Sequence, residues 1–254
     1  MLRIIGRLDI KNEYVIKGIQ MDGLRKIGYS KTISKKLNDA GIDELVYIDT
    51  VASLYSREKK LDQILEVSNQ LSIPLTVAGG IRTLADAKST LRSGADKIAL
   101  NSQALRNPNL IGEIAEVFGS QCVVINIEAK KIGSSDWECF IDNGRERTFK
   151  SVFKWMEEIQ IAGAGEVMIS SVDTDGSQAG FDLELFKKVT PNLDIPWIAA
   201  SGFGNIKHVD QLLDNLTPSG IAIGSAFHYE KISVEEIKKS VQKKNLEVRL
   251  DSNE

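Results

Sequence analysis

The chain has few of the residues that build disulfide frameworks or metal sites. Only two cysteines and two histidines occur among its 254 residues. Cys122 and Cys139 are too few for a disulfide framework, and their spacing matches no zinc motif. No cluster of Cys, His and Asp has the spacing of metal ligands, so we expect no metal and no organic cofactor.

Long apolar runs and strongly charged stretches are also missing. No apolar run approaches the ~20 residues of a membrane span, and the chain starts Met1-Leu2-Arg3, which is charged too early for a signal peptide. The net charge is −3 and no Lys/Arg stripe stands out, which argues against a nucleic-acid surface. Hydrophobic residues make up 42% of the chain, enough for a substantial core. We therefore expect a cytoplasmic globular protein that binds neither nucleic acid nor membrane.

What the chain does contain is a phosphate-binding pattern that occurs twice. The copies are 77–81 with 94–102, and 199–203 with 219–225. Gly79 and Gly202 are as far apart in the chain as Ser102 and Ser225, so the two copies are in register. Glycines expose backbone N–H groups without a Cβ to repel a ligand, and hydroxyl or amide donors beside them suit an anion. Two such sites predict a ligand with a phosphate at each end.

Short β-branched segments alternate with helical periodicity along the whole chain, which is typical of parallel βαβ units. The predicted strands are 3–9, 44–49, 75–78, 96–100, 122–128, 166–171, 195–200 and 219–223. The predicted helices include 58–71, 83–93, 108–117, 151–162, 182–189, 205–215 and 233–244. Eight strands, each followed by a helix, predict a (β/α)8 TIM barrel. An open doubly wound sheet is the alternative, but no GxGxxG motif follows the first strand.

No linker rich in proline, glycine or serine divides the chain, so we predict one barrel domain over residues 1–254. The duplicated pattern splits this domain into two half-barrels, at about 1–119 and 120–254. Residues 131–149, which contain an Asn-Gly pair, predict a β-hairpin insert.

In such barrels the chemistry lies at the carboxyl ends of the strands. Asp9 and Glu128 end the first and fifth strands, at matching places in the two halves. Two carboxylates that face one ligand can act as a general acid–base pair, because different surroundings move their pKa values apart. The alternative is that they only hold loop backbone. Lys17 follows on the first loop, where it can meet an anionic group or orient Asp9, unless it is simply a solvated lysine.

Four other charged residues fall early in their strands. They are Arg3, Glu44, Lys97 and Glu166. We expect their side chains to gather at the opposite mouth of the barrel.

Several segments resemble the cyclase subunits of imidazole glycerol phosphate synthase. They are 3–11, 15–18, 41–45, 78–81, 94–97, 173–176 and 200–202. The resemblance runs in order from residue 3 to about 249, and the motifs are specific together rather than singly. It implies a barrel that takes ammonia from a glutaminase partner and cyclises a substrate with two phosphates, N′-[(5′-phosphoribulosyl)formimino]-5-aminoimidazole-4-carboxamide ribonucleotide. The products are imidazole glycerol phosphate and 5-aminoimidazole-4-carboxamide ribonucleotide.

The resemblance also implies roles for individual residues. Asp9 is one acid–base carboxylate, and Glu128 stands where the family has the second, an aspartate. The first phosphate site comprises Gly80, Asn101 and Ser102, and the second comprises Gly176, Gly202, Gly224 and Ser225. The pocket is lined by Asp49, Asp175 and Ser201, with Lys17 on a mobile first loop. The charged ring of Arg3, Glu44, Lys97 and Glu166 matches the family's gate for ammonia into the barrel axis; a ring that only closes the barrel is the alternative.

Four residues depart from the family pattern. Glu128 is one methylene longer than aspartate, which moves its carboxylate ~1–1.5 Å outward, and misplacement on the order of 1 Å can cost roughly a hundredfold in rate. Phe203 replaces a glycine of the second phosphate site, where we expect its ring to crowd a phosphate or stack on a different ligand. Arg7 replaces a small residue, and Phe149 replaces a glycine. Four such changes around one pocket suggest a changed substrate.

Three alternatives to the cyclase therefore stand. One is a paralogue of the kind associated with surface-polysaccharide amidation, which supplies ammonia for a reaction on a nucleotide sugar. Another is the isomerase barrel of histidine biosynthesis, which has two phosphate sites but needs no ammonia, so the charged ring counts against it. The last is a barrel without catalysis that only docks and activates a glutaminase.

Overall fold

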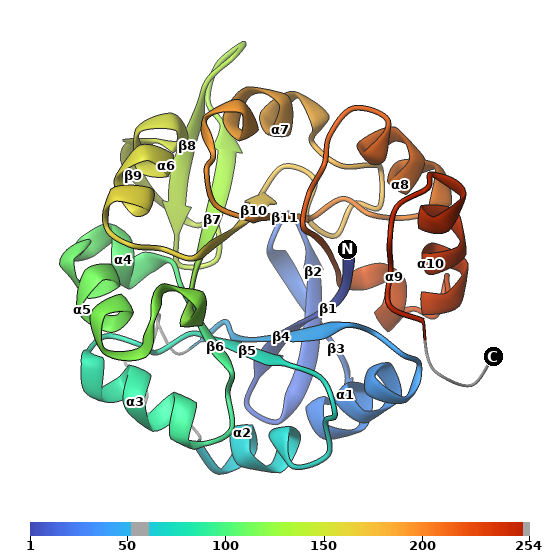
Figure 1. Cartoon of the computed structure of the whole chain (residues 1–254), viewed down its shortest axis with the longest axis horizontal. Coiled ribbons are helices and arrows are strands. Elements are labelled where there is room, and N and C mark those ends of the chain that lie inside the picture. The colour runs from blue at the N-terminus through green and yellow to red at the C-terminus, as the bar shows by residue number, and fades with distance from the viewer. Residues whose placement is uncertain (52–60, 251–254) are drawn as a thin grey trace.

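The computed structural model describes residues 1–51 and 61–250. Its barrel strands are β1 (Arg3–Lys11), β4 (Glu44–Asp49), β5 (Leu75–Ala78), β6 (Lys97–Leu100), β7 (Val123–Lys131), β10 (Glu166–Ser171), β11 (Trp197–Ala200) and β12 (Gly220–Ile223). Each strand pairs in parallel with the next, and β12 returns to pair with β1. These eight strands close into the predicted (β/α)8 TIM barrel, seen end-on in Figure 1, and the open sheet is excluded.

Helices surround this ring of strands (Figure 1). The longer ones are α1 (Ser30–Asp39), α2 (Leu61–Ser68), α3 (Leu84–Arg92), α5 (Asn109–Phe118), α6 (Val152–Ile161), α7 (Leu183–Val189), α8 (Ile206–Leu213) and α10 (Val234–Lys243). Shorter turns are α4 (Ser102–Arg106), α9 (Ser225–His228), η1 (Ser120–Cys122) and η2 (Thr190–Asn192). The start of the predicted helix 58–71 lies outside the described residues. No range was predicted for α1, because it buries only Ser30, Ser34 and Leu37 and so has no apolar stripe.

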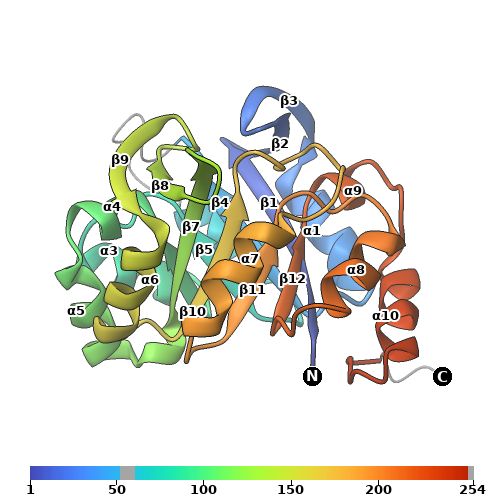
Figure 2. The ribbon, with the colours of Figure 1, turned by 90° about the horizontal axis from the view of Figure 1, so that it is seen from above.

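Two antiparallel extensions rise from the same end of the barrel, at the top of Figure 2. β2 (Tyr14–Ile19) and β3 (Asp22–Tyr29) extend β1, and β8 (Trp137–Ile141) and β9 (Glu146–Ser151) extend β7. The second extension is the predicted hairpin insert, although β7 itself runs on to Lys131. The first was predicted as a loop, and this was wrong. Strand β3 is largely exposed and lacks the apolar alternation that predicts a strand.

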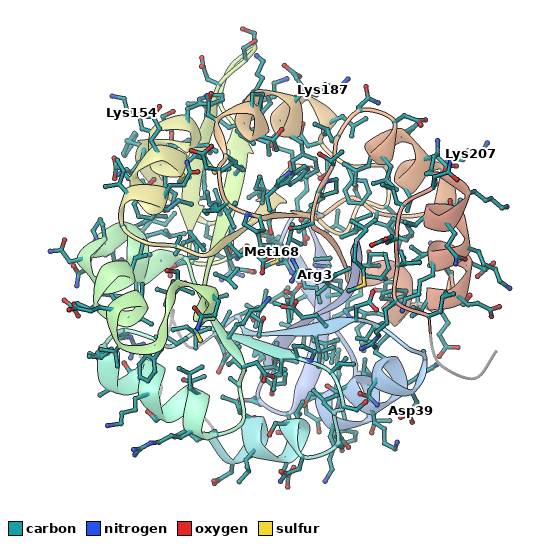
Figure 3. All side chains as sticks on the ribbon, viewed as in Figure 1. Arg3, Asp39, Lys154, Met168, Lys187 and Lys207 are labelled. Atoms are coloured by element: carbon teal, nitrogen blue, oxygen red, sulfur yellow. The ribbon has the colours of Figure 1, made fainter. Side chains whose placement is uncertain are left out.

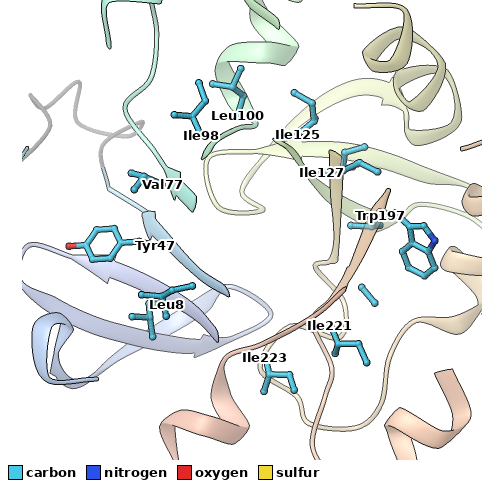
Figure 4. Close-up of a cluster of buried hydrophobic side chains, with 14 of the residues drawn as sticks. Leu8, Tyr47, Val77, Ile98, Leu100, Ile125, Ile127, Trp197, Ile221 and Ile223 are labelled. Atoms are coloured by element: carbon cyan, nitrogen blue, oxygen red, sulfur yellow. The ribbon is translucent and has the colours of Figure 1, made fainter. Parts of the chain in front are cut away.

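Side-chain alternation along the strands builds two apolar layers. Outward side chains pack beneath the helices, among them Leu8, Tyr47, Val77, Ile98 and Ile221 (Figure 4). Inward side chains form a second cluster, here called the inner cluster: Ile5, Val46, Ile48, Ala78, Ala99, Val124, Met168, Ile198, Ala200 and Ala222. The inner cluster separates the polar residues at one mouth of the barrel from those at the other.

Candidate active site at the barrel mouth

Asp9 and Glu128 both lie buried at the mouth where the strands end, with relative exposures of 5% and 6%. Asp9 is on β1 and Glu128 on β7, which are diametrically placed in the closed ring of eight strands. The barrel therefore brings the two predicted carboxylates to one end of its axis from opposite walls.

Asp9 lies in a buried cluster of charges. The Lys17 ammonium donates to Asp9 Oδ2 at 2.7 Å and to Asp175 Oδ2 at 2.8 Å. Ser201 Oγ donates to Asp175 Oδ1 at 2.9 Å. The structure thus joins four predicted site residues, but it places Lys17 within strand β2 rather than on a mobile loop. Pairing of β2 with β1 holds this lysine over the barrel, which corrects the expectation of a loop.

Arg7 completes this charge cluster. Its Nε donates to Asp9 Oδ1 at 3.0 Å, its Nη1 donates to Ser170 Oγ at 3.1 Å, and the same nitrogen lies 3.8 Å from Asp175 Oδ1. Its side chain is 4% exposed. Two cations and two carboxylates therefore neutralise one another in the barrel interior, which is how buried charges are normally tolerated.

The pKa values in the cluster follow from these contacts. Burial by itself raises the pKa of Asp9, but the charges of Arg7 and Lys17 outweigh burial and hold that pKa well below its usual range. Burial lowers the pKa of Lys17, yet the charges of Asp175 and Asp9 outweigh it and leave the pKa raised. Asp9 is therefore an anion, and Lys17 a cation, at neutral pH.

Glu128 is in a different environment. Burial raises the pKa of Glu128 to about 7, against the opposing effects of the Gly144 N–H and of Arg7's charge. That N–H, in the turn between β8 and β9, donates to Glu128 Oε2 at 2.7 Å. Glu128 thus exchanges a proton near neutral pH while Asp9 does not, so the surroundings do move the two pKa values apart.

Glu128 lies in one pocket with the predicted first phosphate site. The pocket is lined by Asp49, Gly80, Asn101, Ser102 and Glu128, together with Arg7, Arg82, Gln103, Arg106, Asn126 and Asn143. Gly80 has φ +65°, a backbone conformation that glycine adopts without strain. Of the second group, only Arg7 was singled out from the sequence. Arg82 follows the Gly79-Gly80 pair, and Arg106 follows Ser102, by only a few positions. This spacing could have identified both arginines from the sequence.

Two residues of the predicted second phosphate site, Gly176 and Gly224, lie against β2. A Cβ added to Gly176 would collide with the Gly18 carbonyl oxygen, and one added to Gly202 with the Gly180 carbonyl oxygen. A Cβ on Gly224 would lie 3.8 Å from Cε of Lys17. Lys17 and Gly176 line a hollow with Arg25 and Lys231 that is separate from the Glu128 pocket. The structure therefore does not join the two phosphate sites in one open pocket.

Two of the four departures from the family pattern lie away from the pocket. Phe203 is 4% exposed, and its ring packs 6.1 Å from that of Phe181 in the apolar layer beneath the helices. Its side chain points outward from the barrel, so it does not crowd a phosphate as expected. Phe149 is 79% exposed on β9, with the Arg147 guanidinium over its ring. Of the four departures, only Arg7 and Glu128 line the pocket. The expectation that all four surround one pocket was therefore wrong.

The four charges at the opposite mouth meet, as expected. Arg3 pairs with Glu44 at 2.6 Å and also with Glu166, and Lys97 lies 3.1 Å from Glu44 and 3.0 Å from Glu166. Each cation thus bridges both carboxylates, and the four form a closed ring. Figure 3 shows Arg3, and Met168 of the inner cluster, near the centre of the ring of strands.

Within residues 1–51 and 61–250, no helix is long and apolar enough to cross a membrane. In the same part of the chain, no group of three or more His, Cys, Asp or Glu is placed to hold a metal ion.

Comparisons with known proteins agree with this geometry. A family model described as "Histidine biosynthesis protein" matches residues 3–233. The imidazole glycerol phosphate synthase subunit HisF of Streptococcus gordonii is 40% identical over 248 residues, which cover 98% of each chain. The proteins of that name from Streptococcus mutans and Bacillus cereus strain G9842 are 39% and 38% identical, over 97% and 98% of this chain. The chain therefore belongs to the histidine biosynthesis protein family, and within it is similar over almost its whole length to the HisF subunits.

Proposed function

We propose that this chain is the cyclase subunit of an imidazole glycerol phosphate synthase. It uses ammonia to convert the two-phosphate formimino-ribulosyl substrate into imidazole glycerol phosphate and 5-aminoimidazole-4-carboxamide ribonucleotide. Similarity to HisF subunits across 98% of the chain carries this proposal. The buried carboxylates Asp9 and Glu128 at one barrel mouth support it. A cytoplasmic location stays a prediction.

The two carboxylates would divide the proton transfers between them. Glu128, with its pKa raised to about 7 by burial, is part neutral acid and part carboxylate at neutral pH, so it can donate a proton or accept one. Asp9 is an anion with Arg7 and Lys17 on its two oxygens. It becomes a useful base only when one of these cations turns to another anion. A substrate phosphate near Gly202 and Gly224 would offer Lys17 that partner.

The remaining site residues would bind and orient the substrate. Gly80, Asn101 and Ser102 would hold one phosphate beside Glu128, and Gly176, Gly202, Gly224 and Ser225 would hold the other once β2 and β3 lift. Asp49, Asp175 and Ser201 would orient the part of the substrate between the phosphates.

Ammonia would enter from the opposite mouth. The ring of Arg3, Glu44, Lys97 and Glu166 is the candidate gate, and a glutaminase subunit seated over it would deliver ammonia into the axis. A heterodimer with such a glutaminase is part of this proposal, and the word "subunit" in the names of the similar proteins supports it.

A turnover assay tests the proposal directly. Purified protein is given the two-phosphate substrate and excess ammonium salt at mildly alkaline pH, and loss of substrate absorbance is followed. We expect turnover, and we expect Asp9→Asn to lower it by roughly 10²–10⁴-fold, the usual contribution of a general acid or base. Asp136→Asn, which changes an exposed aspartate in the β7–β8 turn, is the matched control and should keep full activity.

One observation favours a second candidate, the paralogue that supplies ammonia for amidation of a nucleotide sugar. Of the departures from the family pattern, Arg7 and Glu128 line the pocket. Arg7 adds a positive charge to it, and Glu128 has a side chain one methylene longer than aspartate. Under this reading the wild-type protein is inert with the histidine-pathway substrate, and Glu128→Asp restores some turnover. Inert protein at every ammonium concentration would therefore count against the cyclase.

A further inference from the structure

Arg7 lies between the inner cluster and the two carboxylates. Arg3, Ile5, Arg7 and Asp9 alternate along β1, so their side chains share the inner face of the strand. Ile5 belongs to the inner cluster, Arg3 to the charged ring and Asp9 to the candidate active site. The Arg7 guanidinium thus lies in the polar layer next to the inner cluster, together with Ser170 and Asn126.

The contacts of Arg7 run across the barrel. Its Nη1 donates to Ser170 Oγ on β10, and Ser170 Oγ donates to Asn126 Oδ1 on β7 at 3.1 Å. Ser170 is the pairing partner of Glu128 in the register of β10 with β7. One chain of hydrogen bonds therefore leads from Asp9, through Arg7, to the wall that carries Glu128.

Arg7 does not contact the two carboxylates equally. It donates directly to Asp9, whose other oxygen is taken by Lys17. Glu128 takes part in no ion pair found within 4.0 Å among residues 1–51 and 61–250, and its hydrogen-bond donors, the Gly144 N–H and the Asn101 side chain, are uncharged. The charge of Arg7 therefore acts on Glu128 only from a distance.

We propose that Arg7 is a positioning residue that makes the two carboxylates unequal, holding Asp9 as an anion and leaving Glu128 as the carboxyl that exchanges a proton. This inference rests on the proposed function for its catalytic meaning, but its physical content does not need the substrate. The other titratable groups near Asp9 are Lys17 of β2, Asp175 of the β10–α7 connection, and His228 of α9, whose pKa burial lowers to about 4. Those acting on Glu128 are Arg7 and Asp9.

Removing Arg7 should reduce the difference between the pKa values of Asp9 and Glu128. Asp9 would lose one of its two cations at contact distance, so its pKa rises. The charge of Arg7 lowers the pKa of Glu128 in the wild type, so that pKa also rises when Arg7 is removed. This rise should be smaller than the rise for Asp9. A lysine at this position keeps the charge but lacks the planar guanidinium whose Nε and Nη1 donate to Asp9 and Ser170, so Arg7→Lys should give an intermediate change in the Asp9 pKa.

The test is a titration of the side-chain carboxyl carbons by ¹³C NMR, without substrate, in wild type, Arg7→Met and Arg7→Lys. Spectra of Asp9→Asn and Glu128→Gln assign the two signals. We expect the Asp9 pKa to rise by about one unit or more in Arg7→Met, a tenfold change in proton affinity, and by less in Arg7→Lys. Arg92→Met, on the exposed face of α3, is the matched control and should move neither signal.

An unchanged difference between the Asp9 and Glu128 pKa values in both Arg7 variants overturns the inference. If Arg7→Met does not fold, Arg7→Lys keeps the charge and decides by the same criterion. The pH profile of turnover, measured at constant free ammonia, tests whether Arg7 also affects catalysis. Its acidic limb should move to higher pH in Arg7→Met. Inactive wild-type protein overturns the proposed function but leaves the NMR result standing, so the two failures are distinguishable.

Discussion

At the scale of single residues, the site depends on how one barrel gives two carboxyl groups different pKa values. Asp9 has cations on both oxygens, whereas Glu128 is contacted by uncharged donors, the Gly144 N–H and the Asn101 side chain. Both side chains are equally buried, so burial alone does not separate them. The difference comes from the charges at contact distance, and it makes Glu128 the group with a pKa of about 7.

This difference predicts how stability depends on pH. The pKa of Glu128 is raised from 4.5 to about 7 by folding, so its contribution is complete below about pH 4.5 and is lost as the pH rises through 7. Each pH unit in that interval costs ~1.4 kcal/mol. Between about pH 5.5 and 8.5, wild type should lose about 2 kcal/mol of unfolding free energy relative to Glu128→Gln.

Urea unfolding of both proteins at the two pH values measures the effect. Asp9 works in the opposite sense, because its pKa is lowered, but its contribution is already complete well below this interval. Glu113→Gln, on the exposed side of α5, should follow wild type. A constant difference between wild type and Glu128→Gln across the interval would show that Glu128 does not titrate there.

At the scale of elements, the antiparallel extension β2–β3 covers Gly176 and Gly224 of the second phosphate site. It is held by backbone contacts as well as by Lys17: the Gln20 N–H donates to the Asp175 carbonyl at 2.7 Å, and Asn143 Nδ2 donates to the Met21 carbonyl at 3.0 Å. The second contact joins this extension to the one that carries Gly144. A ligand that occupies the space between Gly176 or Gly224 and this extension must therefore displace β2.

Gly176→Ala should weaken this cover. Gly176 has φ +69°, and a Cβ there would collide with the Gly18 carbonyl oxygen of β2. We expect amide hydrogen exchange in residues 14–29 to speed up by roughly tenfold, which corresponds to ~1.4 kcal/mol of lost protection. Gly23→Ala is the matched control, because Gly23 has φ +63° with no atom within 4 Å of an added Cβ. Equal exchange in the two variants would mean that the close contact with Gly18 does not hold the cover.

At the scale of the whole molecule, the inner cluster divides the barrel into a catalytic mouth and a charged mouth. The carboxylates of the ring are more buried than its cations, with side-chain exposures of 2% for Glu44 and 20% for Lys97. The cations therefore face the side on which a partner would dock. The division into half-barrels stays a prediction, which the matching extensions on β1 and β7 support.

Lys97→Met should impair the delivery of ammonia from the charged mouth to the catalytic mouth. It leaves Arg3 on both carboxylates but opens one side of the ring. In the complex with the glutaminase subunit of the same organism, we expect glutamine-driven turnover to fall on the order of tenfold, or ~1.4 kcal/mol, while ammonium-driven turnover is kept. Lys154→Met, on the exposed face of α6, should change neither (Figure 3). An equal fall in both activities would point to a structural role for the ring.

Sequence patterns predicted the parts that depend on local order. The alternation of strands and helices predicted the barrel, because parallel strands need a crossover helix between them. Strand ends then predicted which residues share a mouth, including Asp9, Glu128 and the four charges of the ring. Strand β3 was missed, since its polar residues pair through backbone hydrogen bonds that leave no apolar pattern.

The chain alone therefore determined the barrel, its two mouths and the residue types at each, because these follow from periodicity and strand register. Only the tertiary structure decided where individual side chains point and what lies beside them. Phe203 packs into the outer layer, while Arg7 reaches Asp9 and Ser170 inside the barrel. Such contacts, between residues far apart in the chain, determine burial and local charge, and so they set the pKa values on which the proposed chemistry depends.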